Sequence, residues 1–324
     1  MSSRRRQYVL TVTAALGGVI LLAWAARRAG ISEIIDGIQR VGWGLIPILG
    51  LGGLRFVVRA EAWRLCAPTD GRLPWRQAFT AFLAGDALGN VTPLGLLASE
   101  PTKVFLTRHH LATRESISSL AIDNLLYSAS IVTMVGGSGV VLLLKVPLPY
   151  EWRKWGTVAL AILFMAAIAF VRLLRGSSGV GTLVPVRWRE RAAALRGSVL
   201  EFSSGHPLRL WRVYALDLVF HALAVLEAFL ALRWLLGAAS PSFLQALLFE
   251  ALNRVITVLF KFVPFRAGVD EVSSGGLAHL LGMDPVTGVA LAIVRKVRNL
   301  FWAGIGMTII AVRPGQAAPA TDHL

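Results

Sequence analysis

Long apolar stretches alternate with short polar connections along most of the chain. Val9–Ala26 and Val158–Val171, for example, contain no ionisable residue. A segment inside a bilayer has no water to solvate charge, and about 20 apolar residues complete one helical crossing. The pattern therefore predicts an all-α, polytopic helical membrane protein with about seven or eight transmembrane helices.

Two of the apolar stretches are interrupted. Gln77–Ala98 contains Asp86 and Pro93 together with several glycines, and Phe265–Met283 also carries glycines and charges. Proline and glycine in a membrane segment free backbone groups that protein or trapped water must satisfy. We expect these stretches to be broken or re-entrant helices.

The interrupted stretches also suggest an internal repeat. Pro93 and Glu100 are seven residues apart, as are Pro264 and Glu271, at an offset of 171 residues. Paired interruptions in corresponding places favour a transporter-type binding site. The distribution of positive loop charge does not decide whether the two copies are inverted or parallel.

Composition supports a single membrane domain. Hydrophobic residues make up 55% of the chain and charged residues only 16%, which excludes a soluble enzyme. We expect residues 1–312 to form one integral membrane (flippase-like) domain and residues 313–324, which include prolines and alanines, to be a disordered tail.

The net charge of +15 fits positive cytoplasmic loops that face anionic lipid. Arg4–Arg6 before the first apolar stretch place the N-terminus in the cytoplasm. No basic stretch is interleaved with aromatic residues as in single-strand binding proteins, so we expect no nucleic-acid partner.

Several charges fall inside apolar stretches, where each costs about 2.5–3.5 kcal/mol. Glu250, Arg254 and Lys261 share one helical face, and Arg295 and Arg298 form another basic stripe. One interpretation is a hydrated cavity whose excess cations receive a phosphate or another anionic headgroup.

Two other interpretations stay open. Glu250 with Arg254, and Asp123 with Arg295, could be ion pairs that fix helix register. Alternatively Arg55, Arg59 and Lys261 could reach the membrane surface from helix ends.

No sequence pattern supports catalysis, a metal or a cofactor. His109 and His110 are adjacent, so they point in different directions on a helix. Zinc-protease, serine-hydrolase and nucleotide-binding motifs do not occur. We expect a protein that is not an enzyme and that binds neither cofactor nor metal.

Several stretches resemble a known family in order and spacing. They are Asn90-Val-Thr-Pro93, Ser99-Glu100-Pro-Thr-Lys103-Val-Phe-Leu, Ala121-Ile-Asp123-Asn, Val263-Pro-Phe-Arg266-Ala-Gly268-Val-Asp270-Glu271, Leu281-Gly282 and Val294-Arg295-Lys-Val-Arg298. In these residues, and over about residues 10–312, the chain resembles the lysylphosphatidylglycerol synthase transmembrane-region family, also called flippase-like integral membrane proteins. The chain has Ser99 where the family commonly has glycine, and Asp123-Asn124 where the family often has an acid followed by arginine.

The resemblance implies lipid handling in the bacterial cytoplasmic (inner) membrane, as in the flippase half of fused synthases and in stand-alone relatives linked to hopanoid or glycolipid export. Larger members carry a soluble aminoacyl-transferase domain. This chain ends about twelve residues after its last predicted crossing, so we expect no synthase activity.

Together these observations predict a protein that binds an amphipathic lipid, of the anionic phospholipid, hopanoid or glycolipid class, and translocates or presents it across the membrane. The alternatives are a non-transporting scaffold that associates with lipid-biosynthesis proteins, and an intramembrane transferase. The oligomeric state stays open. The expected substrate-binding residues are Asn90, Pro93, Glu100, Lys103, Asp123, Arg254, Lys261, Arg266, Glu271, Arg295 and Arg298.

Overall fold

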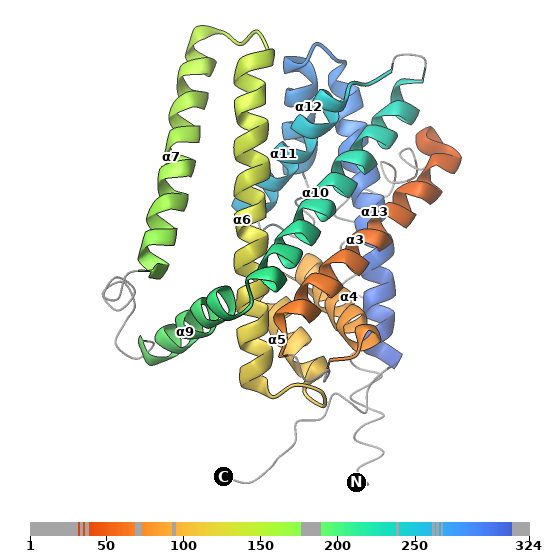
Figure 1. The fold of residues 1–324 in the computed structure, drawn as a ribbon. Helices are drawn as coiled ribbons and strands as arrows, with labels where there is room; N and C mark the ends of the chain where they lie inside the picture. The colour runs from red at the N-terminus through yellow and green to blue at the C-terminus, as the bar shows by residue number, and fades with distance from the viewer. Residues whose placement is uncertain are drawn as a thin grey trace.

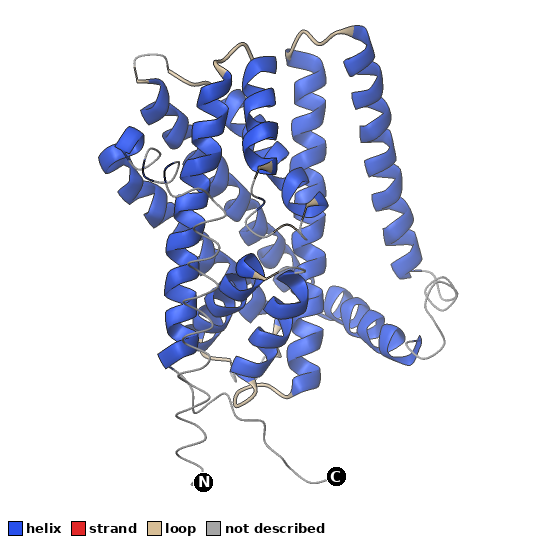
Figure 2. Ribbon diagram, turned by 180° about the vertical axis from the view of Figure 1, so that it is seen from behind, coloured by secondary structure: helices blue, strands red, loops and turns tan. Residues whose placement is uncertain are grey.

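The structure is a computed structural model that describes residues 32, 35, 39–68, 73–92, 95–175, 189–237, 240–260, 263, 266 and 268–312. Within these residues the chain is helical apart from short connections, as Figure 2 shows, which confirms the all-α prediction. The predicted first crossing, Val9–Ala26, and the predicted tail from residue 313 lie outside the described residues.

A short 3-10 helix and ten α-helices follow one another in the described part of the chain (Figure 1). They are η1 (Gly42–Gly44), α3 (Leu45–Cys66), α4 (Trp75–Val91), α5 (Gly95–Thr107), α6 (Thr113–Lys145), α7 (Tyr150–Arg175), α9 (Arg189–Gly205), α10 (Pro207–Leu236), α11 (Phe243–Leu259), α12 (Val269–Leu280) and α13 (Pro285–Val312).

Four helical segments in the described part of the chain are long and apolar enough to cross a membrane. They are Gln39–Cys66, Thr113–Lys145, Tyr150–Arg175 and Pro207–Leu236. The chain is therefore a polytopic helical membrane protein, as its hydropathy predicts. Helix α13 has 28 residues and carries three charges near its middle, Arg295, Lys296 and Arg298.

Helix α7 stands at the edge of the bundle beside α6 (Figure 1). It has no buried residue, although it is the most apolar of the four candidate spans. Two glycines of α6 allow its approach: a Cβ at Gly136 would meet the Phe164 ring at 2.7 Å, and one at Gly139 would meet Leu160 at 2.7 Å. The apolar outer surface of α7 is the kind of surface that lipid tails cover.

Each predicted interrupted stretch contributes to a helical hairpin: Gln77–Ala98 falls in the α4–α5 hairpin, and Phe265–Met283 contains α12 of the α11–α12 hairpin. Helix α4 ends at Val91 and α5 starts at Gly95, while α11 ends at Leu259 and α12 starts at Val269. The first hairpin is tight at its tip, since a Cβ on Gly95 would lie 2.2 Å from the Gly89 carbonyl oxygen. In Figure 1 α4 and α5 lie in the lower half of the bundle, and α11 and α12 lie in the upper half.

Contacts between helices recur in a paired pattern. Helix α3 contacts α10, and α3 packs on α4 and α6 as α10 packs on α11 and α13. Helix α4 packs on α13 as α11 packs on α6, and α3 packs on α13 as α10 packs on α6. The paired helices α3 and α10 run in opposite directions in Figure 1, as do α6 and α13. If α3–α6 are taken as the first half of the bundle and α10–α13 as the second, each of these contacts made by α3 or α4 therefore has a counterpart made by α10 or α11.

Candidate functional site

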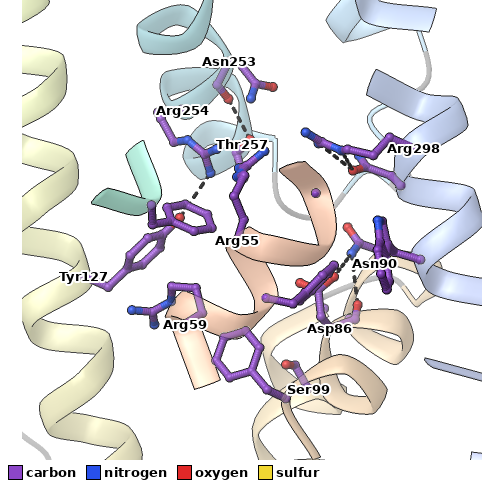
Figure 3. A pocket seen from close by; sticks show the side chains of 18 of the residues that line it. Arg55, Arg59, Asp86, Asn90, Ser99, Tyr127, Asn253, Arg254, Thr257 and Arg298 are labelled. Atoms are coloured by element: carbon purple, nitrogen blue, oxygen red, sulfur yellow. Dashed lines mark hydrogen bonds between the residues drawn. The ribbon is translucent and has the colours of Figure 1, made fainter. Parts of the chain in front are cut away.

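A cavity of about 270 Å³ lies between the two halves of the bundle (Figure 3). Both helical breaks reach it: Gly89 and Gly95 line it from the first hairpin, and Val263 and Arg266 line it from the segment between α11 and α12. The other lining residues are Gly52, Arg55, Phe56, Arg59, Phe82, Asp86, Asn90, Ser99, Glu100, Lys103, Asn124, Tyr127, Phe220, Asn253, Arg254, Thr257, Arg298, Asn299 and Trp302.

Positive charge dominates the lining. Among the described residues, six cationic side chains face the cavity against two acidic ones, Asp86 and Glu100. The six are Arg55, Arg59, Lys103, Arg254, Arg266 and Arg298. Most of the carboxylates that hold these cations lie behind them and do not line the cavity.

The first ion-pair cluster joins α3, α10 and α13 through Glu227. Arg55 Nη1 donates to Glu227 Oε2 at 2.9 Å, and Arg298 Nη1 donates to the other carboxylate oxygen. Arg55 Nε is buried and has no hydrogen-bond partner among the described residues. One carboxylate thus faces two guanidinium groups, both of which line the cavity.

A second cluster surrounds Glu250 of α11. Arg254 Nε donates to Glu250 Oε1 at 2.9 Å, and Arg295 Nη2 donates to Glu250 Oε2 at 3.0 Å. Arg254 Nη1 also donates to the Tyr127 hydroxyl at 3.1 Å, which Figure 3 shows as a dashed line. Here too one buried carboxylate is shared by two arginines, of which only Arg254 faces the cavity.

The third cluster has the opposite balance. Arg59 of α3 donates through Nη2 to Asp123 Oδ2 of α6 at 2.6 Å, and through Nη1 to Asp217 Oδ1 of α10. One guanidinium therefore holds two carboxylates. Of the three residues, only Arg59 lines the cavity.

Aromatic rings separate the arginines. The Phe220 ring lies 4.5 Å from the Arg55 guanidinium and 5.2 Å from that of Arg254, and the Tyr127 ring lies 4.3 Å from that of Arg59. Such contacts contribute about 0.5–2 kcal/mol each and hold the cations in place without neutralising their charge.

The first hairpin contributes the two acids of the lining. Lys103 Nζ donates to Glu100 Oε1 at 2.9 Å across one turn of α5, and its ammonium lies 4.2 Å from the centre of the Phe82 ring. Asn90 Nδ2 donates to Asp86 Oδ2 at 2.8 Å along α4. Lys103 balances the charge of Glu100, so Asp86 is the acid of the lining with no cation bonded to it among the described residues.

The predicted binding residues divide into three groups. Those that line the cavity are Asn90, Glu100, Lys103, Arg254, Arg266 and Arg298. Those that lie behind it as ion-pair partners are Asp123, with Arg59; Arg295, with Glu250; and Glu271, with Lys296. Pro93 and Lys261 lie outside the described residues, as does Pro264.

Two of the electrostatic expectations are wrong. Asp123 does not pair with Arg295, because α3 and α10 lie nearby and Arg59 is the cation nearest to Asp123. Arg55 and Arg59 do not reach the membrane surface: they are 7% and 4% exposed and point inward to carboxylates. Buried acids on other helices outcompete the solvent for these guanidinium groups.

Sequence reasoning missed several lining residues. The sequence offers Arg55 and Arg59 only as arginines that could reach the membrane surface, and it does not single out Tyr127 or Asp86 as binding residues. Glu227, which holds two cavity arginines, was also overlooked. The charged residues among these could have been found from the sequence, because an ionisable residue within an apolar helix is by default a candidate functional residue.

Comparison with known proteins identifies the family. A family model described as the lysylphosphatidylglycerol synthase TM region matches residues 9–306. Searches of curated proteins and of solved structures gave no significant match. The family match spans the described helices as far as Gly306, in the last third of α13, and includes every residue that lines the cavity. The chain therefore belongs to the lysylphosphatidylglycerol synthase transmembrane-region family.

Proposed function

We propose that the protein binds the anionic headgroup of an amphipathic membrane lipid in the cavity and moves it between the leaflets. The observation that carries this proposal is the arrangement of charge. Six cations face the cavity, while most of their carboxylate partners stand behind them. A bilayer-spanning protein bears the cost of such an arrangement where a ligand or ion uses it.

The Glu227 and Glu250 clusters explain why an anion is favoured. Each combines one carboxylate with two arginines, so each carries one excess positive charge inside the bundle. A phosphate or another anionic group between Arg55, Arg254 and Arg298 would complete both clusters with charge-assisted hydrogen bonds. The unpartnered Arg55 Nε is one donor available for it.

Cavity size favours a headgroup over a whole lipid. Pockets that enclose drug-sized molecules measure about 300–1,000 Å³. The volume of about 270 Å³ suits a polar headgroup whose acyl chains remain outside the bundle.

The paired contacts favour movement over static binding. We infer that α3–α6 and α10–α13 are inverted copies, and that the α4–α5 and α11–α12 hairpins are re-entrant from opposite faces of the membrane. Inverted repeats with broken helices at a shared site are the usual architecture for alternating access. In this arrangement α13 also crosses the membrane, with its charges turned inward.

The alternatives have less support. A scaffold that docks lipid-biosynthesis proteins would need no cation-lined cavity between the hairpin tips. An intramembrane transferase would need a base beside the ligand. Of the acids among the predicted binding residues, Asp123 and Glu271 do not line the cavity and Glu100 is bonded to Lys103. The other acid of the lining, Asp86, accepts a hydrogen bond from Asn90.

Proteoliposomes test the proposal. Wild-type protein is reconstituted with acyl-labelled fluorescent phosphatidylglycerol, and dithionite bleaches the probe in the outer leaflet. We expect wild-type protein to expose inner-leaflet probe, and Arg254→Gln to abolish this while Glu250 keeps Arg295. Arg64→Gln, which removes an exposed arginine of α3 paired with Glu61, is the matched control. Bleaching identical to that of protein-free vesicles would refute lipid movement.

A further inference from the structure

The Arg59 cluster has a charge balance that the Glu227 and Glu250 clusters lack. Two carboxylates, Asp123 and Asp217, share the single guanidinium of Arg59, and both aspartate side chains are fully buried. The cluster thus carries one excess negative charge, whereas the Glu227 and Glu250 clusters each carry one excess positive charge. A buried excess charge is normally removed by a partner or by a proton.

Two oxygen atoms in this cluster lack partners. Asp123 Oδ1 and Asp217 Oδ2 are buried and accept no hydrogen bond from any described residue. A bare carboxylate oxygen in such a place costs the desolvation free energy of a charged group. A proton on either aspartate would remove the excess charge.

Among the described residues, no cation other than Arg59 is bonded to Asp123 or Asp217. Lys103 and Glu100 of α5 also lie near Asp123, and their charges have opposite effects: Lys103 favours the charged carboxylate, whereas Glu100 disfavours it. From α3, α6 and α10 the cluster faces Cys66, the Tyr127 ring and His221, and His221 Nε2 is hydrogen-bonded to Ser130 at 3.0 Å. Arg209, which interacts electrostatically with the nearby Cys66 thiol, donates hydrogen bonds to the carbonyl groups of Leu65 and Ala67 at the end of α3.

We propose that Asp123 and Asp217 share one exchangeable proton, and that the protein takes it up when an anionic headgroup binds at Arg59. The proposal rests on the proposed function for its ligand. The proton comes from water to an aspartate oxygen, and it returns to water when the headgroup leaves. The guanidinium then bonds to the headgroup and to the remaining carboxylate.

The electrostatic interaction fixes the sign of this coupling: anion binding and proton binding favour each other. An anion beside Arg59 adds negative charge next to two aspartates and so favours the protonated form of one of them. By thermodynamic linkage, protonation raises the affinity for the anion by the same factor by which anion binding raises the affinity for the proton. With one proton carried per lipid, a pH difference of about one unit can drive an about tenfold accumulation of lipid in one leaflet.

Infrared spectroscopy tests the proton site on purified protein without any transport. We expect wild-type protein to show a protonated-carboxyl stretching band that titrates with pH. Either Asp123→Asn or Asp217→Asn should remove it, since one aspartate and Arg59 form a balanced pair. Glu61→Gln, which removes a carboxyl group of α3 that is bonded to Arg64 and does not line the cavity, is the matched control and should keep the band. Absence of the band in wild-type protein, its loss in Glu61→Gln, or its survival in both other variants would overturn the proposal.

The coupling is tested with short-chain phosphatidylglycerol, because its phosphodiester does not titrate over the pH range in which the carboxyl band does. At fixed pH the lipid should increase the band in wild-type protein, and an unchanged band would overturn the coupling. Proteoliposomes under a pH gradient separate the two proposals. If lipid moves equally fast with and without the pH gradient and no carboxyl band is seen, the proton site is refuted and the proposed function stands. A titrating band without lipid movement removes the proposed function and leaves the proton site.

Discussion

Arg55 and Glu227 connect the two crossing helices α3 and α10 through a buried hydrogen bond of 2.9 Å. Glu227 is also bonded to Arg298 of α13, so the carboxylate retains a cation if either arginine is removed. This redundancy separates the binding role of a cavity arginine from its role in stability. It allows variants that lose a cavity charge and leave no buried carboxylate unpaired.

Arg55→Gln removes one charge from the cavity and leaves Glu227 paired with Arg298. The variant should fold with a melting temperature close to that of the wild-type protein, because Arg298 still holds Glu227. Its rate of lipid movement should fall about tenfold or more, since a hydrogen bond to a charged group contributes about 1.5–3 kcal/mol and tenfold corresponds to about 1.4 kcal/mol. The proteoliposome assay and a thermal scan measure the two quantities. An unchanged rate would show that the Arg55 side chain does not contact the ligand.

Arg59→Gln should behave differently. It leaves Asp123 and Asp217 without a cation, and breaking a buried pair in this way costs about 3–5 kcal/mol. We expect a clear loss of thermal stability in detergent. The triple variant with Asp123→Asn and Asp217→Asn should recover much of it, because no charge of this cluster then remains. If the triple variant is as unstable as the single one, the loss comes from packing and not from charge.

The tip of the first hairpin should tolerate no side chain at Gly95. A Cβ there would lie 2.2 Å from the Gly89 carbonyl oxygen, a backbone atom that cannot rotate away. We expect Gly95→Ala to cost about 1–3 kcal/mol of stability and to weaken lipid binding, because both glycines line the cavity. Gly137→Ala in α6 is the control, since a Cβ there meets no atom within 4 Å. Equal stability of the two variants would contradict the tight packing of the tip.

The outer surface of α7 should face lipid. Met165 lies near the middle of this helix and is 63% exposed. Met165→Arg should therefore reduce membrane integration, with a cost of about 2.5–3.5 kcal/mol, whereas Met165→Leu should have no effect. The fraction of protein that resists alkaline extraction from membranes measures this. Full integration of the arginine variant would mean that water or protein covers this surface of α7.

Apolar stretches and their interruptions carry most of the information about the fold. The all-helical character follows from long runs without charge. The break between α4 and α5 follows from proline, which has no backbone N–H to donate, and from the neighbouring glycines, which lower the stability of a helix. The sequence also shows the two interrupted segments in corresponding places.

Ion-pair partners could not be predicted in the same way. Asp123 and Arg295 hold the same position, the eleventh, in α6 and α13, and the sequence allowed an ion pair between them. In the fold, matching positions belong to helices with different neighbours, so Asp123 meets Arg59 and Arg295 meets Glu250. Periodicity along one helix places side chains on a face, whereas a partner on another helix depends on how the helices cross.

Native mass spectrometry of gently purified protein tests the central claim most directly, because it counts the lipids that remain bound and identifies their headgroups. The account predicts that one anionic lipid stays on the wild-type protein and on Arg64→Gln, and that the double variant Arg55→Gln/Arg254→Gln loses it. The double variant keeps Glu227 with Arg298 and Glu250 with Arg295, so it should remain folded. Equal retention of that lipid by all three proteins would contradict the claim that the cavity cations bind the headgroup.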